Sequence, residues 1–137
     1  MNLIGQAILT ARKYYDENTF YHAMRVAAYV ADDNLVSSSD KDNCIVLAIM
    51  HDLLEDTDYK IDEHSIINHR LEECLKLLTK SESVSYEDYL KNIKENYATH
   101  PEAYWVKLAD MKDHLSLTDT LTEKLKEKYL SGLRYLL

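Results

Sequence analysis

The feature that most constrains this chain is an apolar run that leads directly into a cluster of acidic residues. Residues Cys44–Met50 are all apolar, with no Gly or Pro, and His51-Asp-Leu-Leu-Glu-Asp56 follows immediately. A helix that is apolar on all sides belongs in a protein interior. We therefore predict a buried central helix over 44–56 that carries one imidazole and three carboxylates from the core toward a cleft.

The polar groups of this helix are expected to share one surface. Glu55 follows His51 by four residues, as Asp56 follows Asp52, and residues at that spacing are neighbours on a helix. Three neighbouring carboxylates repel one another, burial adds to that cost, and a bound divalent cation would reverse it. The alternative is a helix C-terminus with a core histidine and solvated acids, although the helix dipole disfavours acids there. This stretch alone leaves both interpretations open.

Composition and periodicity favour an all-α fold. The chain of 137 residues contains two Gly and one Pro, which are too few for a turn-rich β fold. Its length suits one domain over residues 1–137, and we predict about six or seven helices in it. Apolar residues recur at helical spacing in further segments, approximately 3–15, 20–32, 61–78, 86–96, 101–115 and from 118 onward.

Charge and hydropathy exclude several classes of partner. Twenty-four acidic and sixteen basic residues give a net charge of −8, which argues against nonspecific binding to nucleic acid or anionic membranes. No apolar run approaches the roughly 20 residues of a membrane span, and no signal-peptide pattern is present. Cys44 and Cys74 lie in apolar helical contexts and are predicted to be reduced core residues. We expect a cytoplasmic protein that handles a small molecule; the sequence does not indicate its oligomeric state.

The other histidines and one distant acid carry little weight singly. His22 lies early in the second predicted helix, and Asp110 stands beside the apolar stripe of a later one. A lone histidine is more often structural than a ligand, and an acid at the edge of a stripe is usually solvated. His64 and His69 have polar neighbours and are expected to be solvated, and His100 beside the proline is not expected to be a ligand.

Taken together, these residues resemble the HD-domain phosphohydrolases. The family's early histidine, its His-Asp pair on a buried helix and its later aspartate correspond to His22, His51-Asp52 and Asp110. A narrower resemblance, to the (p)ppGpp hydrolase domains and their small stand-alone relatives, rests on four motifs in order over roughly residues 3–115. These motifs are His51-Asp-Leu-Leu-Glu-Asp-Thr57, Leu78-Thr-Lys80, Ser85-Tyr-Glu-Asp-Tyr89 and Val106-Lys-Leu-Ala-Asp110.

The resemblance implies a single-domain HD-type helical bundle with one metal ion. His22, His51, Asp52 and Asp110 would ligate a divalent ion, usually Mn²⁺ in this family. A mixed set of imidazoles and carboxylates also suits Fe²⁺ or Zn²⁺. Such an ion would acidify a water molecule and polarise the phosphoryl group under attack.

The resemblance also implies roles for residues around the metal. Glu55 and Asp56 match the family's catalytic acid pair and would orient or deprotonate the nucleophile and assist the leaving group. Which of the two does which is not decided by the sequence. Lys80 and Tyr86 lie in the matching motifs, and His114 stands where the family favours Asn. These three are the candidate substrate-binding residues.

The chain also departs from the alarmone hydrolases around the first ligand. That family has a basic, glycine-containing segment and a Pro-Tyr-Ile-x-His-Pro run, whereas this chain has Arg12-Lys-Tyr-Tyr15 and Phe20-Tyr-His-Ala23. The predicted function is metal-dependent hydrolysis of a nucleotide phosphate or pyrophosphate, with guanosine 3',5'-bis(diphosphate) (ppGpp) as one candidate. The alternatives are an HD nucleotidase for simpler nucleoside phosphates and a non-catalytic metal-binding helical module.

Overall fold

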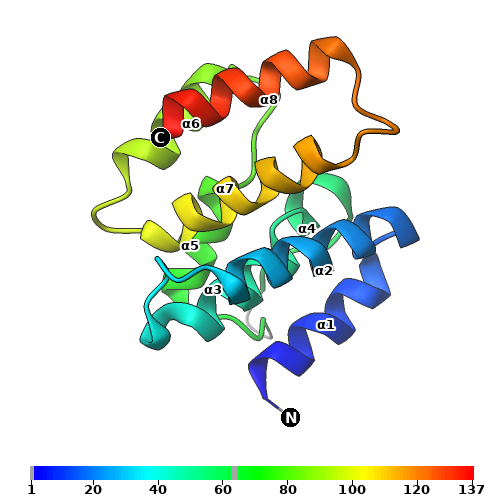
Figure 1. Ribbon diagram of the computed structural model, residues 1–137. Coiled ribbons are helices and arrows are strands. Elements are labelled where there is room, and N and C mark those ends of the chain that lie inside the picture. Colours follow the sequence, from blue (N-terminus) through cyan, green and yellow to red (C-terminus); the bar gives the residue numbers. More distant parts are fainter. Residues whose placement is uncertain (1, 63–64) are drawn as a thin grey trace.

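The computed structural model describes residues 2–62 and 65–137, and the described residues form helices and connecting loops, without a strand (Figure 1). His64 lies outside these residues. The all-α prediction is confirmed: the described ranges contain seven helices of nine or more residues, and the four-residue α4 is additional. The helices are α1 (Leu3–Tyr14), α2 (Glu17–Asp32), α3 (Ser38–Met50), α4 (Leu53–Asp56), α5 (His69–Leu77), α6 (Tyr86–Glu95), α7 (Pro101–Ser116) and α8 (Glu123–Leu136).

Side-chain caps determine where several helices begin. The Asp16 carboxylate accepts a hydrogen bond from the Thr19 backbone N–H, so α2 starts at Glu17 and not near residue 20 as predicted. The Asn68 side chain caps α5 in the same way. The described residues between α4 and Asn68 are loop, although the sequence pattern predicted helix from residue 61. Apolar side chains in that loop still pack on the core, which explains the apolar pattern.

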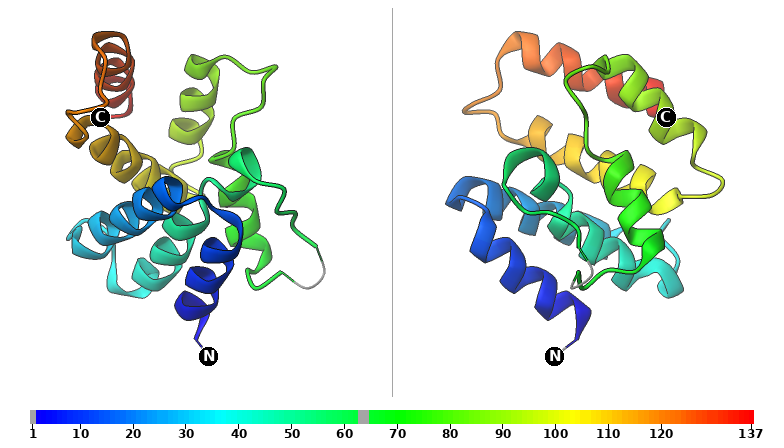
Figure 2. Two further views of the ribbon diagram at one scale, coloured as in Figure 1. Left: turned by 90° about the vertical axis from the view of Figure 1, so that its right-hand side faces the viewer. Right: turned by 180° about the vertical axis from the view of Figure 1, so that it is seen from behind.

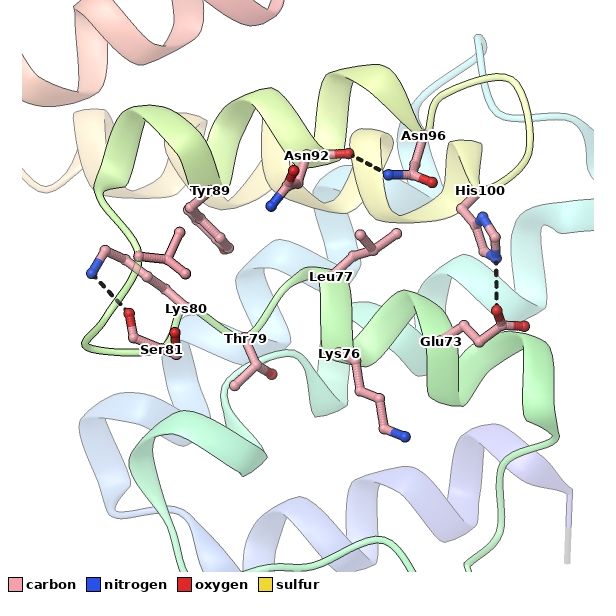
Figure 3. A pocket seen from close by; sticks show the side chains of 11 residues that line it. Glu73, Lys76, Leu77, Thr79, Lys80, Ser81, Tyr89, Asn92, Asn96 and His100 are labelled. Carbon is pink, nitrogen blue, oxygen red and sulfur yellow. Dashed lines mark hydrogen bonds and ion pairs between the residues drawn. The ribbon is translucent and has the colours of Figure 1, made fainter.

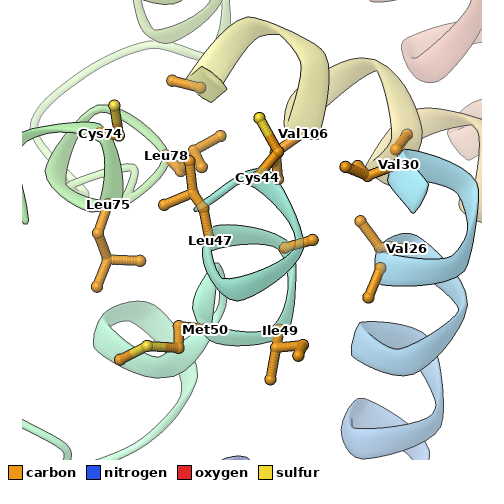
Figure 4. Close-up of a cluster of buried hydrophobic side chains, with 14 of the residues drawn as sticks. Val26, Val30, Cys44, Leu47, Ile49, Met50, Cys74, Leu75, Leu78 and Val106 are labelled. Carbon is orange, nitrogen blue, oxygen red and sulfur yellow. The ribbon is translucent and has the colours of Figure 1, made fainter. Parts of the chain in front are cut away.

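Helix α3 is the centre of the bundle and contacts α1, α2, α5 and α7. Helices α6 and α8 lie on one side of α7, and α1–α3 lie on the other (Figures 1 and 2). The apolar run 44–50 is buried at all but one position, as the sequence predicted. Figure 4 shows α3 between the valines of α2 and the side chains of α5; the labelled residues are Val26, Val30, Cys44, Leu47, Ile49, Met50, Cys74, Leu75, Leu78 and Val106.

Both cysteines are buried and unbridged core residues, as predicted. Burial raises the pKa of the Cys44 and Cys74 thiols to about 12. No helix within the described ranges is long and apolar enough to cross a membrane.

The predicted helix over 44–56 is not continuous, which corrects the sequence-based expectation. The Tyr15 hydroxyl donates a hydrogen bond to Ile49 O at 2.8 Å and accepts one from the Asp52 backbone N–H at 3.1 Å. His51 Nδ1–H donates to Ala48 O at 2.6 Å. Side chains therefore satisfy backbone groups that would otherwise continue the helix, and an inserted side chain is a known cause of helix breaks. The break turns His51 and Asp52 toward α2 and α7.

Candidate metal centre and active site

The four predicted metal ligands converge from three parts of the chain. His22 lies on α2, His51 and Asp52 form the turn between α3 and α4, and Asp110 lies on α7. The Nε2 atoms of His22 and His51 lie 2.8 Å and 3.2 Å from Asp110 Oδ1. Asp52 Oδ2 lies 3.2 Å from His51 Nε2 and 3.7 Å from His22 Nε2. His22, His51 and Asp110 are buried, and Asp52 is partly buried.

These spacings are those of ligands around one ion. Ligands about 2.1 Å from a metal and at right angles to each other lie about 3 Å apart. The donor atoms of His22, His51 and Asp52 lie within 4.8 Å of one another, as do those of His22, Asp110 and His114. The residues present therefore fit a divalent cation, with His114 as a further nitrogen donor at the edge of the cluster.

Hydrogen bonds on the far side of each imidazole orient its ring. His51 Nδ1–H donates to the Ala48 carbonyl, and His22 Nδ1 lies 2.6 Å from Asp113 Oδ2. A neutral imidazole that donates through Nδ1 has its lone pair on Nε2. Both Nε2 atoms face the Asp110 carboxylate. Histidine ligands in metal sites are oriented in the same way, by a hydrogen bond from the ring nitrogen that does not bind the metal.

The electrostatics of the cluster favour positive charge within it. Burial opposes protonation of both imidazoles, but nearby carboxylates outweigh it: Asp110 and Asp113 raise the pKa of His22, and Asp52 and Asp110 raise the pKa of His51. Burial alone would raise the pKa of Asp110, yet the Lys107 ammonium and the neighbouring histidines hold it well below its usual range. The same attraction that favours imidazole protons would hold a divalent cation, because a cation and those protons compete for one site.

The predicted acid pair lies at the rim of the cluster. Glu55 and Asp56 are exposed residues of α4, and Glu55 Oε1 accepts a hydrogen bond from the Lys80 backbone N–H at 2.8 Å. Partial burial of its carboxylate, together with the charges of Asp52 and Glu55, raises the pKa of Asp56 to about 6. Both acids line a cavity of about 250 Å³ whose wall also contains His51, Asp52 and Asp110.

The three candidate substrate-binding residues, Lys80, Tyr86 and His114, line the same cavity. The His114 ring stacks on Tyr129 with centroids 4.6 Å apart and an interplanar angle of 6°, and its Nε2 lies 3.3 Å from Asp110 Oδ1. Lys128 Nζ lies 4.4 Å from the centroid of the Tyr86 ring. The buried Tyr86 hydroxyl has no hydrogen-bond partner among the described residues. Helix α8 thus contributes a cation and an aromatic ring.

Two further pockets adjoin this cavity. One, of about 450 Å³, shares Asp52, Asp56 and His114 with it and gives access to His22. The other, of about 380 Å³, lies between α5 and α6 and shares Lys80 and Tyr89 (Figure 3). Several polar groups of this α5–α6 pocket bond within the protein, since His100 pairs with Glu73 and Asn96 donates to the Asn92 carbonyl. The four predicted ligands thus border the first two of these spaces, and the α5–α6 pocket adjoins them through Lys80 and Tyr89.

Sequence reasoning missed the charged side chains directly behind the ligands. Asp113 accepts hydrogen bonds from Arg25 at 2.8 Å and 3.0 Å besides its contact with His22. Lys107 Nζ donates to Asp110 Oδ2 at 2.8 Å. Arg25 follows His22 by three residues, and Lys107 and Asp113 lie three residues on either side of Asp110. Residues three positions apart on a helix lie on the same face. A charged residue at this spacing from a predicted ligand could therefore have been identified from the sequence as a neighbour of that ligand. Lys128 and Tyr129 of α8 were also missed, since that helix showed only a packing face.

Comparisons with known proteins show the fold. No protein-family model matches the sequence, and no curated protein does so either. Among solved structures, the chain is similar to a metazoan ortholog of SpoT, described as hydrolysing ppGpp and playing a role in starvation responses. The TM-score is 0.72 at 17% sequence identity, and the match covers 99% of this chain and 84% of that one. The match shows that the two chains share a fold, and the single helical bundle predicted from the sequence is confirmed.

Proposed function

We propose that this protein is a metal-dependent phosphohydrolase acting on a nucleotide phosphate or pyrophosphate. The observation that carries the proposal is the convergence of His22, His51, Asp52 and Asp110, the last three of which line one cavity. The likeness of fold to a protein described as hydrolysing ppGpp supports the same class of reaction and makes ppGpp one candidate substrate. Residues 1–137 would form the one domain that carries out this reaction.

The donor set supports one divalent ion held by two imidazoles and two carboxylates. Mn²⁺ is the expected ion, and Fe²⁺ or Zn²⁺ also suit mixed nitrogen and oxygen ligands. When bound, such an ion supplies Lewis acidity toward a phosphoryl oxygen and lowers the pKa of water.

The acid pair would move the protons of the reaction. A group with a pKa of about 6 can both accept and release a proton near neutral pH, which favours Asp56 for this task. Glu55 is held in place by its bond to the Lys80 backbone, which suits a residue that orients a nucleophile. We assign neither acid exclusively to the acid or the base role.

Positive charge and aromatic rings around the cavity would bind the substrate. Lys80 and Lys128 supply cations for phosphate in a protein with a net charge of −8. Tyr86 and His114 offer rings and polar atoms beside the same space. We expect the partner to be a small nucleotide in the cytoplasm and not a nucleic acid or a membrane.

The size of the cavity favours one alternative, a nucleotidase acting on simpler nucleoside phosphates. A space of about 250 Å³ is smaller than the roughly 300–1,000 Å³ typical of ligand pockets. It would hold the reacting phosphate, while the nucleoside would extend into an adjoining pocket. The non-catalytic alternative requires that the metal site serve stability alone.

A nucleotide panel separates these functions. Phosphate and pyrophosphate release are measured with Mn²⁺ on ppGpp, nucleoside triphosphates and nucleoside monophosphates, using wild type and His51→Ala. We expect Mn²⁺-dependent release from at least one nucleotide and none from His51→Ala. Release from monophosphates but not from ppGpp would select the nucleotidase. Metal binding without release from any member of the panel would overturn the enzymatic proposal.

A further inference from the structure

The carboxylate of Asp113 lies directly behind His22. Asp113 is 0% exposed, and its Oδ2 lies 2.6 Å from His22 Nδ1. Arg25 donates to both of its oxygens, from Nε at 2.8 Å and from Nη2 at 3.0 Å. Two helices thus supply a chain of contacts that runs from the Arg25 guanidinium through Asp113 to the imidazole.

This arrangement determines which nitrogen of His22 carries the proton. An ionised carboxylate only accepts hydrogen bonds, so the His22 nitrogen facing Asp113 must donate. The other nitrogen, Nε2, lies 2.8 Å from Asp110 Oδ1 within the cluster. A cation that binds there takes the place of the proton on Nε2 and leaves the proton on Nδ1. Arg25 fixes the plane of the Asp113 carboxylate, because a guanidinium holds a carboxylate through two parallel hydrogen bonds.

The other histidine of the cluster is oriented by different means. His51 Nδ1–H donates to the Ala48 backbone carbonyl, which is present whatever the side chain. The Nδ1 atom of His22 instead bonds to a side chain, the carboxylate of Asp113. Of the two histidines, His22 is therefore the one whose outer hydrogen bond a single substitution can remove.

We propose that Asp113, held by Arg25, is a positioning residue that fixes His22 in its metal-binding tautomer and thereby sets the affinity of the site for a divalent cation. The proposal rests on the metal site of the proposed function. It concerns only the residues behind the ligand, and its test does not require a known substrate.

A second arginine–carboxylate pair, between Arg70 of α5 and the buried Glu102 of α7, provides a matched control. Glu102 is 2% exposed, and Arg70 donates to its two oxygens at 2.9 Å and 2.8 Å. This pair has the same chemistry and similar burial, and the Glu102 carboxylate also accepts a hydrogen bond from the Cys74 thiol, away from the metal cluster. A purely structural role for Asp113 predicts that disrupting either pair has the same consequences.

The test compares Asp113→Asn and Arg25→Gln with Glu102→Gln and Arg70→Gln. Calorimetric titration with Mn²⁺ measures the affinity of each protein, and thermal unfolding measures its stability. We expect Asp113→Asn to weaken Mn²⁺ binding about 10–100-fold, as loss of an outer partner of a ligand does elsewhere. We expect Glu102→Gln to lower the melting temperature but to leave the affinity within about twofold, because sites without shared partners act independently.

Nitrogen chemical shifts of the His22 ring, recorded on the metal-free proteins at a pH high enough for the ring to be neutral, report which nitrogen keeps the proton. Wild type is expected to carry its proton on Nδ1, whereas the amide introduced by Asp113→Asn could also donate and so permit the other tautomer. The Arg25 side chain is 42% exposed, so Arg25→Gln tests the same chain of contacts with little risk to folding. Its loss of affinity should be smaller than that of Asp113→Asn and in the same direction.

Equal loss of affinity in the Asp113 and Glu102 variants would overturn the proposal, as would an unchanged tautomer and affinity in Asp113→Asn. A wild-type protein that binds Mn²⁺ tightly but hydrolyses no nucleotide would overturn the enzymatic function and leave this proposal supported by the tautomer and affinity data. A wild-type protein without metal affinity would overturn both the site and this role for Asp113.

Discussion

The Tyr15 hydroxyl should account for a measurable share of the stability, because it bridges the break between α3 and α4. Tyr15→Phe removes the bond donated to Ile49 O and the bond accepted from the Asp52 N–H. A hydrogen bond contributes about 1 kcal/mol, and a buried group left unpaired costs about 1–3 kcal/mol. We expect Tyr15→Phe to lower the free energy of unfolding by about 2–3 kcal/mol.

Tyr89→Phe provides the control. Tyr89 is as buried as Tyr15, at 7% exposed. Its hydroxyl donates a hydrogen bond to Leu78 O at 2.8 Å but does not connect the two sides of a helix break. We expect this variant to lose about 1 kcal/mol. For a chain of this size, the two losses correspond to falls in melting temperature of roughly 6–15 °C and roughly 3–5 °C.

Urea unfolding of wild type and both variants measures these values, and amide hydrogen exchange at Asp52 gives a local reading. Exchange at Asp52 should be faster in Tyr15→Phe and unchanged in Tyr89→Phe. If Tyr15→Phe costs no more than Tyr89→Phe and Asp52 stays protected, the helix break is stabilised by something other than the tyrosine bridge.

Three further predictions concern the acids and the thiols. Glu55→Gln should retain the metal and the fold yet reduce turnover about 10²-fold or more, as loss of an acid–base group does; steady-state kinetics with metal analysis of the same sample checks this, and near-wild-type turnover would exclude Glu55 from the mechanism. Because the pKa of Asp56 is raised to about 6, the carboxylate is charged above that pH; if it acts as the base, kcat/KM should fall below pH 6 in wild type, and this limb should vanish in Asp56→Asn. Because burial raises the pKa of Cys44 and Cys74 to about 12, neither should react with iodoacetamide in the native protein at pH 8, whereas both should react in denaturant; rapid native labelling would contradict their place in the core.

The sequence was sufficient to predict the helical bundle and the four side chains that converge. The apolar run before His51 required burial, and its burial on several sides by α1, α2, α5 and α7 follows from that requirement. Neither His22 nor Asp110 alone indicates a metal site. The two residues could be predicted as ligands only because they stand in order with the His51-Asp52 pair. Their convergence depends on α2 and α7 both packing against α3, and that packing follows from the apolar spacing of each helix.

The break after Met50 could not be predicted from local sequence. No Gly or Pro marks it, and the hydroxyl that bridges it comes from Tyr15, which is distant in the chain. Asp113 and Arg25 were missed for a related reason. On its own helix each is an ordinary charged residue, and only the packing of α2 against α7 shows that Arg25 pairs with a buried carboxylate.

Metal stoichiometry tests the central claim most directly. Wild type, His51→Ala and Asp110→Asn are purified under mild conditions, equilibrated with Mn²⁺, freed of excess ion and analysed for metal content per chain. We expect one ion per chain in wild type and almost none in either variant, because each variant removes a ligand and leaves buried charges without a partner. Equal metal content in all three proteins would show that His22, His51, Asp52 and Asp110 do not form the site.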